Sequence, residues 1–133
     1  MQMFLSKYPT SDRMSECIDI IVEMTEKLVE KSFISARLYY DLGYYDSAII
    51  ALRNSLIEFP ETRYREELMF LILKSSYLLA DKSIPSKQRE RYQATVDEYY
   101  SFIGEFPEGT HSREAKRMYE ASNKFLENHN KQT

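Results

Sequence analysis

The sequence predicts an all-α protein, a superhelix of about five helices that pack antiparallel in chain order. Its 133 residues include only three glycines and four prolines, a composition that favours long uninterrupted helices. In addition, an aromatic residue followed by proline, with threonine shortly after, occurs three times, beginning at Tyr8, Phe59 and Phe106. A helix-ending phrase that recurs in this way is typical of repeat proteins, which usually bind other molecules.

The first predicted helix covers residues 11–42, which contain no proline or glycine. Thr10 or Ser11 is a suitable cap at its start, and Gly43 is a suitable end. We expect one long helix, with a bend near Ser32 as the alternative. Cys17 falls on its apolar side and is expected to be a buried thiol. The residues expected to face inward recur at helical intervals: Met14, Ile18, Ile21, Met24 or Thr25, Leu28, Phe33, Ala36 and Tyr40.

The second predicted helix, 46–58, follows the short turn GYY and should pack antiparallel to the first. Phe59-Pro60 ends it, because proline disfavours helical geometry in the preceding residue. Thr62 is then expected to cap the third helix, 63–80, which is apolar around most of its circumference. The third helix should therefore be the most buried element. The inner face of the second helix is expected to comprise Ala48, Ile49, Leu52 and Leu56.

The fourth predicted helix, 87–105, follows a polar loop and is again ended by an aromatic-proline pair. The fifth, 112–126, carries few apolar residues, as a terminal capping helix requires. We expect one domain over 1–126 and a frayed tail over 127–133. The expected inward residues are Tyr92, Thr95 or Val96, Tyr99, Phe102 and Ile103 in the fourth helix, and Ala115, Met118, Tyr119 and Phe125 in the fifth.

The repeated phrases align at fixed offsets. Tyr45, Ala48, Leu52 and Leu56 precede Pro60 by 15, 12, 8 and 4 residues, and Tyr92, Thr95, Tyr99 and Ile103 precede Pro107 at the same offsets. With Ala36, Tyr39 and Gly43 further upstream, this is the tetratricopeptide register. The prolines lie 51 and 47 residues apart, more than the usual ~34, so the repeats are elongated. Residues 1–8 resemble the end of a helix whose partner is missing, which predicts a C-terminal fragment of a longer protein.

No catalytic or metal-binding pattern is present, so we expect no enzyme activity, no cofactor and no metal. His111 and His129 lack metal-ligand spacing, and the adjacent carboxylates Glu66-Glu67 and Asp97-Glu98 are expected to be solvated. A net charge of −3 argues against a nucleic-acid partner. No apolar run approaches the ~20 residues of a membrane span, and the first residues lack a secretion signal.

The eleven tyrosines are the most unusual feature of the composition. Most fall at inward helical positions and should pack in the core. In the doublets, however, one tyrosine should be partly exposed, and exposed tyrosines are good anchors for a protein partner. Together with polar residues on the second and fourth helices, they predict a contact surface that includes Tyr44, Arg53, Asn54, Lys87, Arg89, Arg91 and Tyr100.

The segments ARLYYDLGYYDSAIIALRNSLIEFPET (36–62) and RYQATVDEYYSFIGEFPEG (91–109) resemble the C-terminal half of the BamD (ComL-like) family of outer-membrane assembly lipoproteins. The resemblance implies a non-enzymatic scaffold on the periplasmic face of the outer membrane. It also implies docking on the POTRA domains of the barrel-assembly protein. We expect this chain to lack the family's lipid anchor, because Cys17 is predicted to lie within a helix.

Three other interpretations remain open at this stage. One is a generic periplasmic repeat adaptor of another envelope complex. The second, from a different class, is an enzyme or glycan-binding protein that uses the aromatic surface. A deep pocket with ionisable groups or stacked tyrosines would favour it, whereas a shallow groove between helix pairs would not. The third concerns assembly: the incomplete N-terminal repeat is also expected to allow a homodimer.

Overall fold

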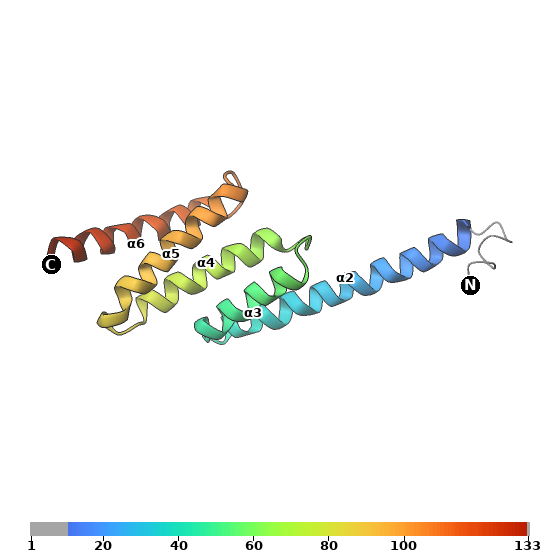
Figure 1. Ribbon diagram of the computed structural model, residues 1–133, viewed down its shortest axis with the longest axis horizontal. Helices are drawn as coiled ribbons and strands as arrows, with labels where there is room; N and C mark the ends of the chain where they lie inside the picture. Colours follow the sequence, from blue (N-terminus) through green and yellow to red (C-terminus); the bar gives the residue numbers. More distant parts are fainter. Residues whose placement is uncertain (1–10, 133) are drawn as a thin grey trace.

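The computed structural model describes residues 11–132, with side chains described from Arg13 to Asn128. Within this range the chain is all-helical, and each helix packs against the next in an α-α superhelix (Figure 1). The predicted all-α, tetratricopeptide-like fold is confirmed. Tyr8-Pro9 and Thr10 lie outside the described residues. The helices are α2 (Ser11–Asp41), α3 (Tyr45–Glu58), α4 (Arg65–Asp81), α5 (Pro85–Glu105) and α6 (Ser112–Gln132).

The two described aromatic-proline turns have the same backbone geometry. Phe59 and Phe106 end α3 and α5 with φ, ψ of −128°, 74° and −130°, 66°. In each turn the aromatic residue donates its N–H to the carbonyl four residues earlier, at 2.9 Å. Repetition of sequence thus gives repetition of structure. The prediction for Thr62 is wrong, because Tyr64 occupies the N-cap of α4 and Thr62 Oγ1 accepts the Tyr64 N–H within the turn.

The helix boundaries differ most from the sequence-based ranges at the start of α5 and the end of α6. α2 is one helix, and Gly43 follows it with a φ of 85°, a conformation that glycine adopts without steric cost. α5 begins at Pro85 rather than in the loop after it, since proline at the first helical position loses no hydrogen bond. α6 continues to Gln132, beyond the predicted end at Leu126.

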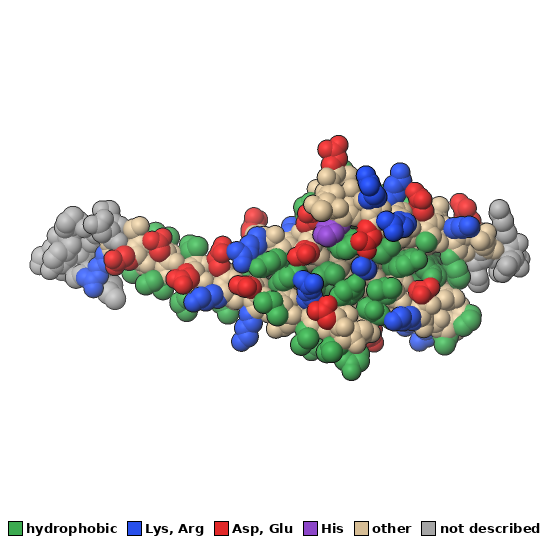
Figure 2. All heavy atoms as spheres, turned by 180° about the vertical axis from the view of Figure 1, so that it is seen from behind, with side chains coloured by type: hydrophobic (Ala, Val, Ile, Leu, Met, Phe, Trp, Pro, Cys, Tyr) green, Lys and Arg blue, Asp and Glu red, His purple; other side chains and the backbone are tan. Residues whose placement is uncertain are grey.

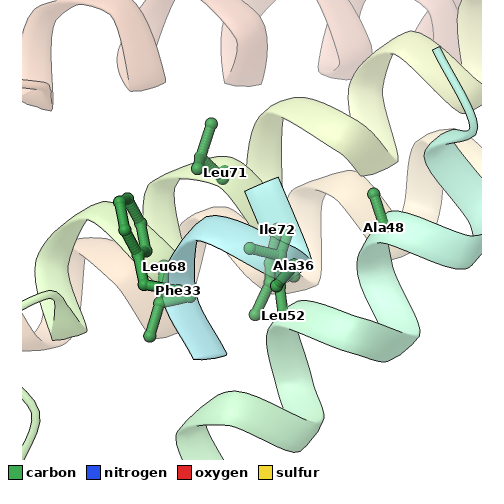
Figure 3. Close-up of a cluster of buried hydrophobic side chains, with 7 residues drawn as sticks. All are labelled: Phe33, Ala36, Ala48, Leu52, Leu68, Leu71 and Ile72. Atoms are coloured by element: carbon green, nitrogen blue, oxygen red, sulfur yellow. The ribbon is translucent and has the colours of Figure 1, made fainter. Parts of the chain in front are cut away.

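The core is organised around α4, which packs against α3 and α5 and also touches α2 and α6. Its middle is buried on all sides, as its continuous apolar sequence predicts. Toward the N-terminal side it closes a cluster with α2 and α3 (Figure 3). That cluster comprises Phe33, Ala36, Ala48, Leu52, Leu68, Leu71 and Ile72.

On its other side, α4 packs against α5 and α6. Phe70 and Leu73 of α4 meet Phe102 of α5 in a second buried cluster. α6 closes this cluster with Ala115 and Met118. Met118 and Leu126 of α6 are buried, Tyr119 and Phe125 are half-buried, and no large apolar side chain is markedly exposed in its described part, as a terminal capping helix requires.

The N-terminal half of α2 extends beyond the rest of the molecule (Figure 1). The inward orientation predicted for its apolar residues is wrong: Ile21 is 62% exposed and Leu28 is 56% exposed. Met14, Ile18 and Met24 are exposed as well. The predicted burial of Cys17 is also wrong, because its thiol lies on the same uncovered stretch. Figure 2 shows apolar side chains on the surface of this projecting segment.

Removal of a core side chain from α3 should destabilise the protein strongly. Leu52 is fully buried between α2 and α4, whereas Ile50, two residues away, is 63% exposed. We expect Leu52→Ala to lower the free energy of unfolding by about 2–5 kcal/mol, because it leaves a cavity. Ile50→Ala should change it by no more than about 0.5 kcal/mol. Urea denaturation followed by circular dichroism measures both, and equal losses would contradict the packing described.

Two glycines should respond in opposite directions to the same substitution. Gly43 has a positive φ, whereas Gly104 lies inside α5 with open space around its Cα. We expect Gly43→Ala to destabilise the fold by about 1 kcal/mol because alanine is strained at this φ. Gly104→Ala should stabilise it by about 0.5–1 kcal/mol through higher helix propensity. Thermal unfolding of the two variants beside the parent chain tests the difference in sign.

Candidate protein-docking surface

The outward face of α3 exposes two isoleucines and two polar residues. Ile50, Arg53, Asn54 and Ile57 are spaced so that they share one side of the helix. Ile50 is 63% exposed and Ile57 is 75% exposed, the largest value among the exposed large apolar side chains of the described residues. Arg53 and Asn54, both predicted contact residues, lie between them and are exposed. A mixed apolar and polar face of this kind suits contact with a protein.

Beside this face, a groove of about 280 Å³ lies between α3, α4 and α5. Leu56, Met69 and Ile72 provide its apolar lining, and Ile57 lies at its edge. Charged side chains from all three helices complete the wall. The groove is open to solvent, so an extended segment or a helix edge of a partner could occupy it.

One ion pair crosses this groove, and a second joins α4 to α5 beside it. Arg53 of α3 pairs with Glu98 of α5, so the prediction that Glu98 is merely solvated is wrong. Arg65 at the start of α4 forms a bidentate pair with Glu105, with N–O distances of 2.9 and 2.8 Å. Hydrogen bonding to Arg65 lowers the pKa of Glu105, and the same bond raises the pKa of Arg65. The first pair links α3 to α5 and the second links α4 to α5. Together they place positive and negative side chains at the groove.

The predicted basic residues of α5 lie near its N-terminus. Lys87 and Arg89 are exposed, while Arg91 is half-buried and donates a hydrogen bond to Ser83 Oγ. Arg91 therefore braces the turn between α4 and α5. No acidic residue lies in the first turn of α5. Since the N-terminal end of a helix favours negative charge, Lys87 and Arg89 do not serve local helix stability there.

The tyrosines form a surface cluster between α5 and α6. Tyr99 stacks on Tyr119 with ring centroids 4.4 Å apart, and Tyr100 meets the same ring edge-on at 5.5 Å. The hydroxyls of Tyr100 and Tyr119 are hydrogen-bonded at 3.0 Å, which raises the pKa of Tyr119. Tyr100 is 56% exposed and retains an open face for contact. Tyr44 is exposed in the turn before α3.

The structure brings only some of the predicted contact residues together. Arg53 and Asn54 share the outward face of α3, whereas Lys87 and Arg89 lie at the start of α5 and Tyr100 lies near its end. The sequence-based prediction missed Ile50, Ile57, Glu98 and Arg65. The seven-residue spacing of the isoleucines was a usable signal for one exposed helix face, but the ion pairs join residues 45 and 40 positions apart.

A second groove, of about 390 Å³, lies between α4 and α6 on another part of the surface. Its charged residues include Lys74 and Glu114, which are paired at 2.9 Å, and Arg117. His111, at the start of α6, stacks on Phe70 with ring centroids 4.1 Å apart, so its ring serves packing. In the described part of the chain, no three His, Cys, Asp or Glu side chains lie close enough to share a metal ion.

None of the helices in residues 11–132 is long and apolar enough to cross a bilayer. The fold and the exposed helix faces define the class: a tetratricopeptide-like helical repeat with open grooves between its helices. Its sequence is similar to that of the putative outer membrane protein assembly factor BamD of Aquifex aeolicus (strain VF5). The two are 33% identical over 109 residues, which is 82% of this chain and 34% of the relative.

This similarity confirms the resemblance to the BamD family that the sequence motifs predict. The chain spans about a third of the length of that relative. No protein-family model matches the chain.

The Arg65–Glu105 pair should be visible in the titration of Glu105. Because hydrogen bonding to Arg65 lowers the folded-state pKa, the pair stabilises the fold above the unfolded pKa of ~4.3. That stability should be lost as the pH falls through the lower, folded-state pKa. We expect Arg65→Met to return the Glu105 pKa to its ordinary range, while Arg53→Met leaves it unchanged. Carboxyl-detected NMR measures the Glu105 pKa in each variant. An unaltered Glu105 pKa in Arg65→Met would contradict the pairing of Arg65 with Glu105.

Proposed function

We propose that this chain is a non-enzymatic docking segment of an outer-membrane protein assembly factor. It acts on the periplasmic face of the outer membrane and binds the POTRA domains of the barrel-assembly protein. The similarity to a putative BamD supports the general role in assembly. The docking itself is inferred from the exposed face of α3 and the groove beside it, together with the family resemblance.

The exposed isoleucines of α3 carry this proposal. Ile57 is 75% exposed at the edge of a groove with an apolar lining, and Ile50 lies two turns earlier on the same side. Contact with water is unfavourable for large apolar side chains in such a position, and burial against a partner lowers their free energy. The neighbouring Arg53–Glu98 pair offers groups of both signs at the rim, which can select orientation.

The basic residues at the start of α5 provide a second point of contact. Lys87 and Arg89 occupy positions where the helix dipole disfavours positive charge, so local stability does not account for them. An acidic patch on the partner would account for both. The seven predicted contact residues thus divide into an α3 group, a basic group on α5, and the exposed tyrosines Tyr44 and Tyr100.

A non-enzymatic role is consistent with how the charged groups are arranged. In the α3–α5 groove the carboxylates are paired with arginines, and in the α4–α6 groove Glu114 is paired with Lys74. For Glu105 the pairing lowers the pKa, the opposite of the raised pKa that a general acid needs. The α4–α6 groove favours a second candidate function, an adaptor for a peptide of another envelope complex.

Binding to purified POTRA domains tests the proposed docking. We expect Arg53→Glu and Ile57→Glu each to weaken binding about tenfold or more, because they alter the centre and the edge of the α3 face. Lys87→Glu with Arg89→Glu should also weaken binding, mainly by slowing association at low salt. Val22→Glu, an equally polar change on the exposed part of α2, serves as the matched control and should bind normally.

The charge-swap variant Arg53→Glu with Glu98→Arg separates stability from recognition. It keeps an ion pair between α3 and α5 but exchanges its signs. We expect it to fold as well as the parent chain while binding remains weak. No POTRA binding by the folded chain, or binding unaffected by the α3 variants, would overturn the proposed site. Retained binding that is lost on substitution of Arg117 would favour the α4–α6 groove instead.

A further inference from the structure

The exposed surface of α2 contains a heptad pattern that runs along nearly its whole length. From Cys17 to Leu38, in alternating steps of four and three, the residues fall on one strip of the helix, and Leu42 continues the pattern directly after α2, where its N–H still donates to the Leu38 carbonyl. All eight members are exposed, and we call them the α2 seam. The first set, at one heptad position, is Ile21, Leu28, Ser35 and Leu42, and the second set is Cys17, Met24, Lys31 and Leu38.

The α2 seam is separate from the side of α2 that forms the core. At ~100° per residue, its members lie on average about 140° round the helix from Phe33 and Ala36, which pack against α3 and α4. Leu38 and Leu42 are 54% and 59% exposed even though the neighbouring part of α2 is covered on its core side. The seam is therefore an additional strip alongside the folded body, and it continues onto the projecting half of the helix, which Figure 1 shows.

We infer that the α2 seam binds the α2 seam of a second copy of this chain, in an antiparallel two-helix coiled coil. In an antiparallel pair, residues of the first set face residues of the second set on the other copy. Ile21 then faces Leu38, Leu28 faces Lys31, Met24 faces Ser35, and Cys17 faces Leu42, with each layer occurring twice by symmetry. The strip is thus complementary to itself.

Charge and shape favour the antiparallel orientation over the parallel one. A parallel pair would place Lys31 against its own copy within an apolar seam, which is unfavourable. It would also bring the two bodies, attached near the C-terminal end of α2, to the same end of the coil. The antiparallel pair places each Lys31 opposite Leu28, with the two lysines in adjacent layers rather than face to face, and it places the bodies at opposite ends. The positions that flank the seam carry only Lys27 and Asp41 as charges, so no like-charge contact opposes it.

The available area fits a dimer that dissociates on dilution. From Cys17 to Leu42 the seam is about 39 Å long, and a contact strip ~10 Å wide covers about 400 Å² per copy. The total of about 800 Å² is below the usual size of specific, stable interfaces, so we expect a weak dimer. Large exposed apolar side chains are concentrated on α2 and absent from the described part of α6. Association through one apolar end gives a closed pair rather than a filament.

Disulfide cross-linking tests the orientation, using the natural Cys17. We expect Leu42→Cys to form a covalent dimer on mild oxidation, since the antiparallel pair places residue 42 of one copy opposite Cys17 of the other. Leu42→Cys in a Cys17→Ser background should not cross-link, and neither should the parent chain through Cys17 alone. Cross-linking of the parent chain, or none in Leu42→Cys, would overturn the antiparallel dimer.

Sedimentation equilibrium of the full chain tests the surface itself. Ile21→Glu should raise the dissociation constant about tenfold or more, because it places a carboxylate opposite Leu38 inside the seam. Val22→Glu is the matched control: Val22 is 53% exposed on the same helix, against 62% for Ile21, but lies outside the seam. Equal effects of the two variants would overturn the proposal. A parent chain that is monomeric at every concentration tested would also overturn it, and would indicate that another segment covers the seam. This inference is independent of the proposed docking on POTRA domains.

Discussion

Enclosure of α4 is the constraint on which the rest of the structure depends. Its middle is apolar in every direction, with Leu68, Phe70, Ile72 and Leu73 each at most 5% exposed. No single neighbour can cover such a helix, so α3 and α5 must lie on its two flanks. The space that remains between those flanking helices, above Met69 and Ile72, is the groove beside the candidate docking face. The groove is therefore a direct result of how α4 is buried.

Arg65 connects this packing to the repeated turns. It donates to the carbonyl of Pro60, in the first aromatic-proline turn, and pairs with Glu105, directly before the second. One guanidinium thus joins the ends of two successive repeats. Each repeat ends in the same backbone geometry, so this link joins equivalent points of two repeats. It connects the start of α4 to the end of α5, next to the groove that Arg65 lines.

Helical periodicity predicted the helices and the buried faces of α3 and α5 because those faces are covered by sequence neighbours. Ala48, Leu52, Thr95 and Phe102 are all buried as expected. Periodicity failed for Cys17, since an apolar pattern shows that a face is apolar but not whether another element covers it. The candidate surface was predictable only in part. Local spacing can place Arg53 and Asn54 on one face, but it contains no information on pairing with Glu98, which depends on the tertiary angle between α3 and α5.

The uncovered part of α2 illustrates how one helix can present two apolar faces. Ile18 precedes Ala36, and Val22 precedes Tyr40, by eighteen residues, which is about five full turns, so each pair shares a direction. That face becomes core where α3 and α4 are present and stays open beyond them. The α2 seam behaves differently, because Leu38 and Leu42 are exposed beside the folded body, where core packing is already complete. Incomplete packing of the projecting half therefore explains the first face but not the seam, which needs a partner of its own.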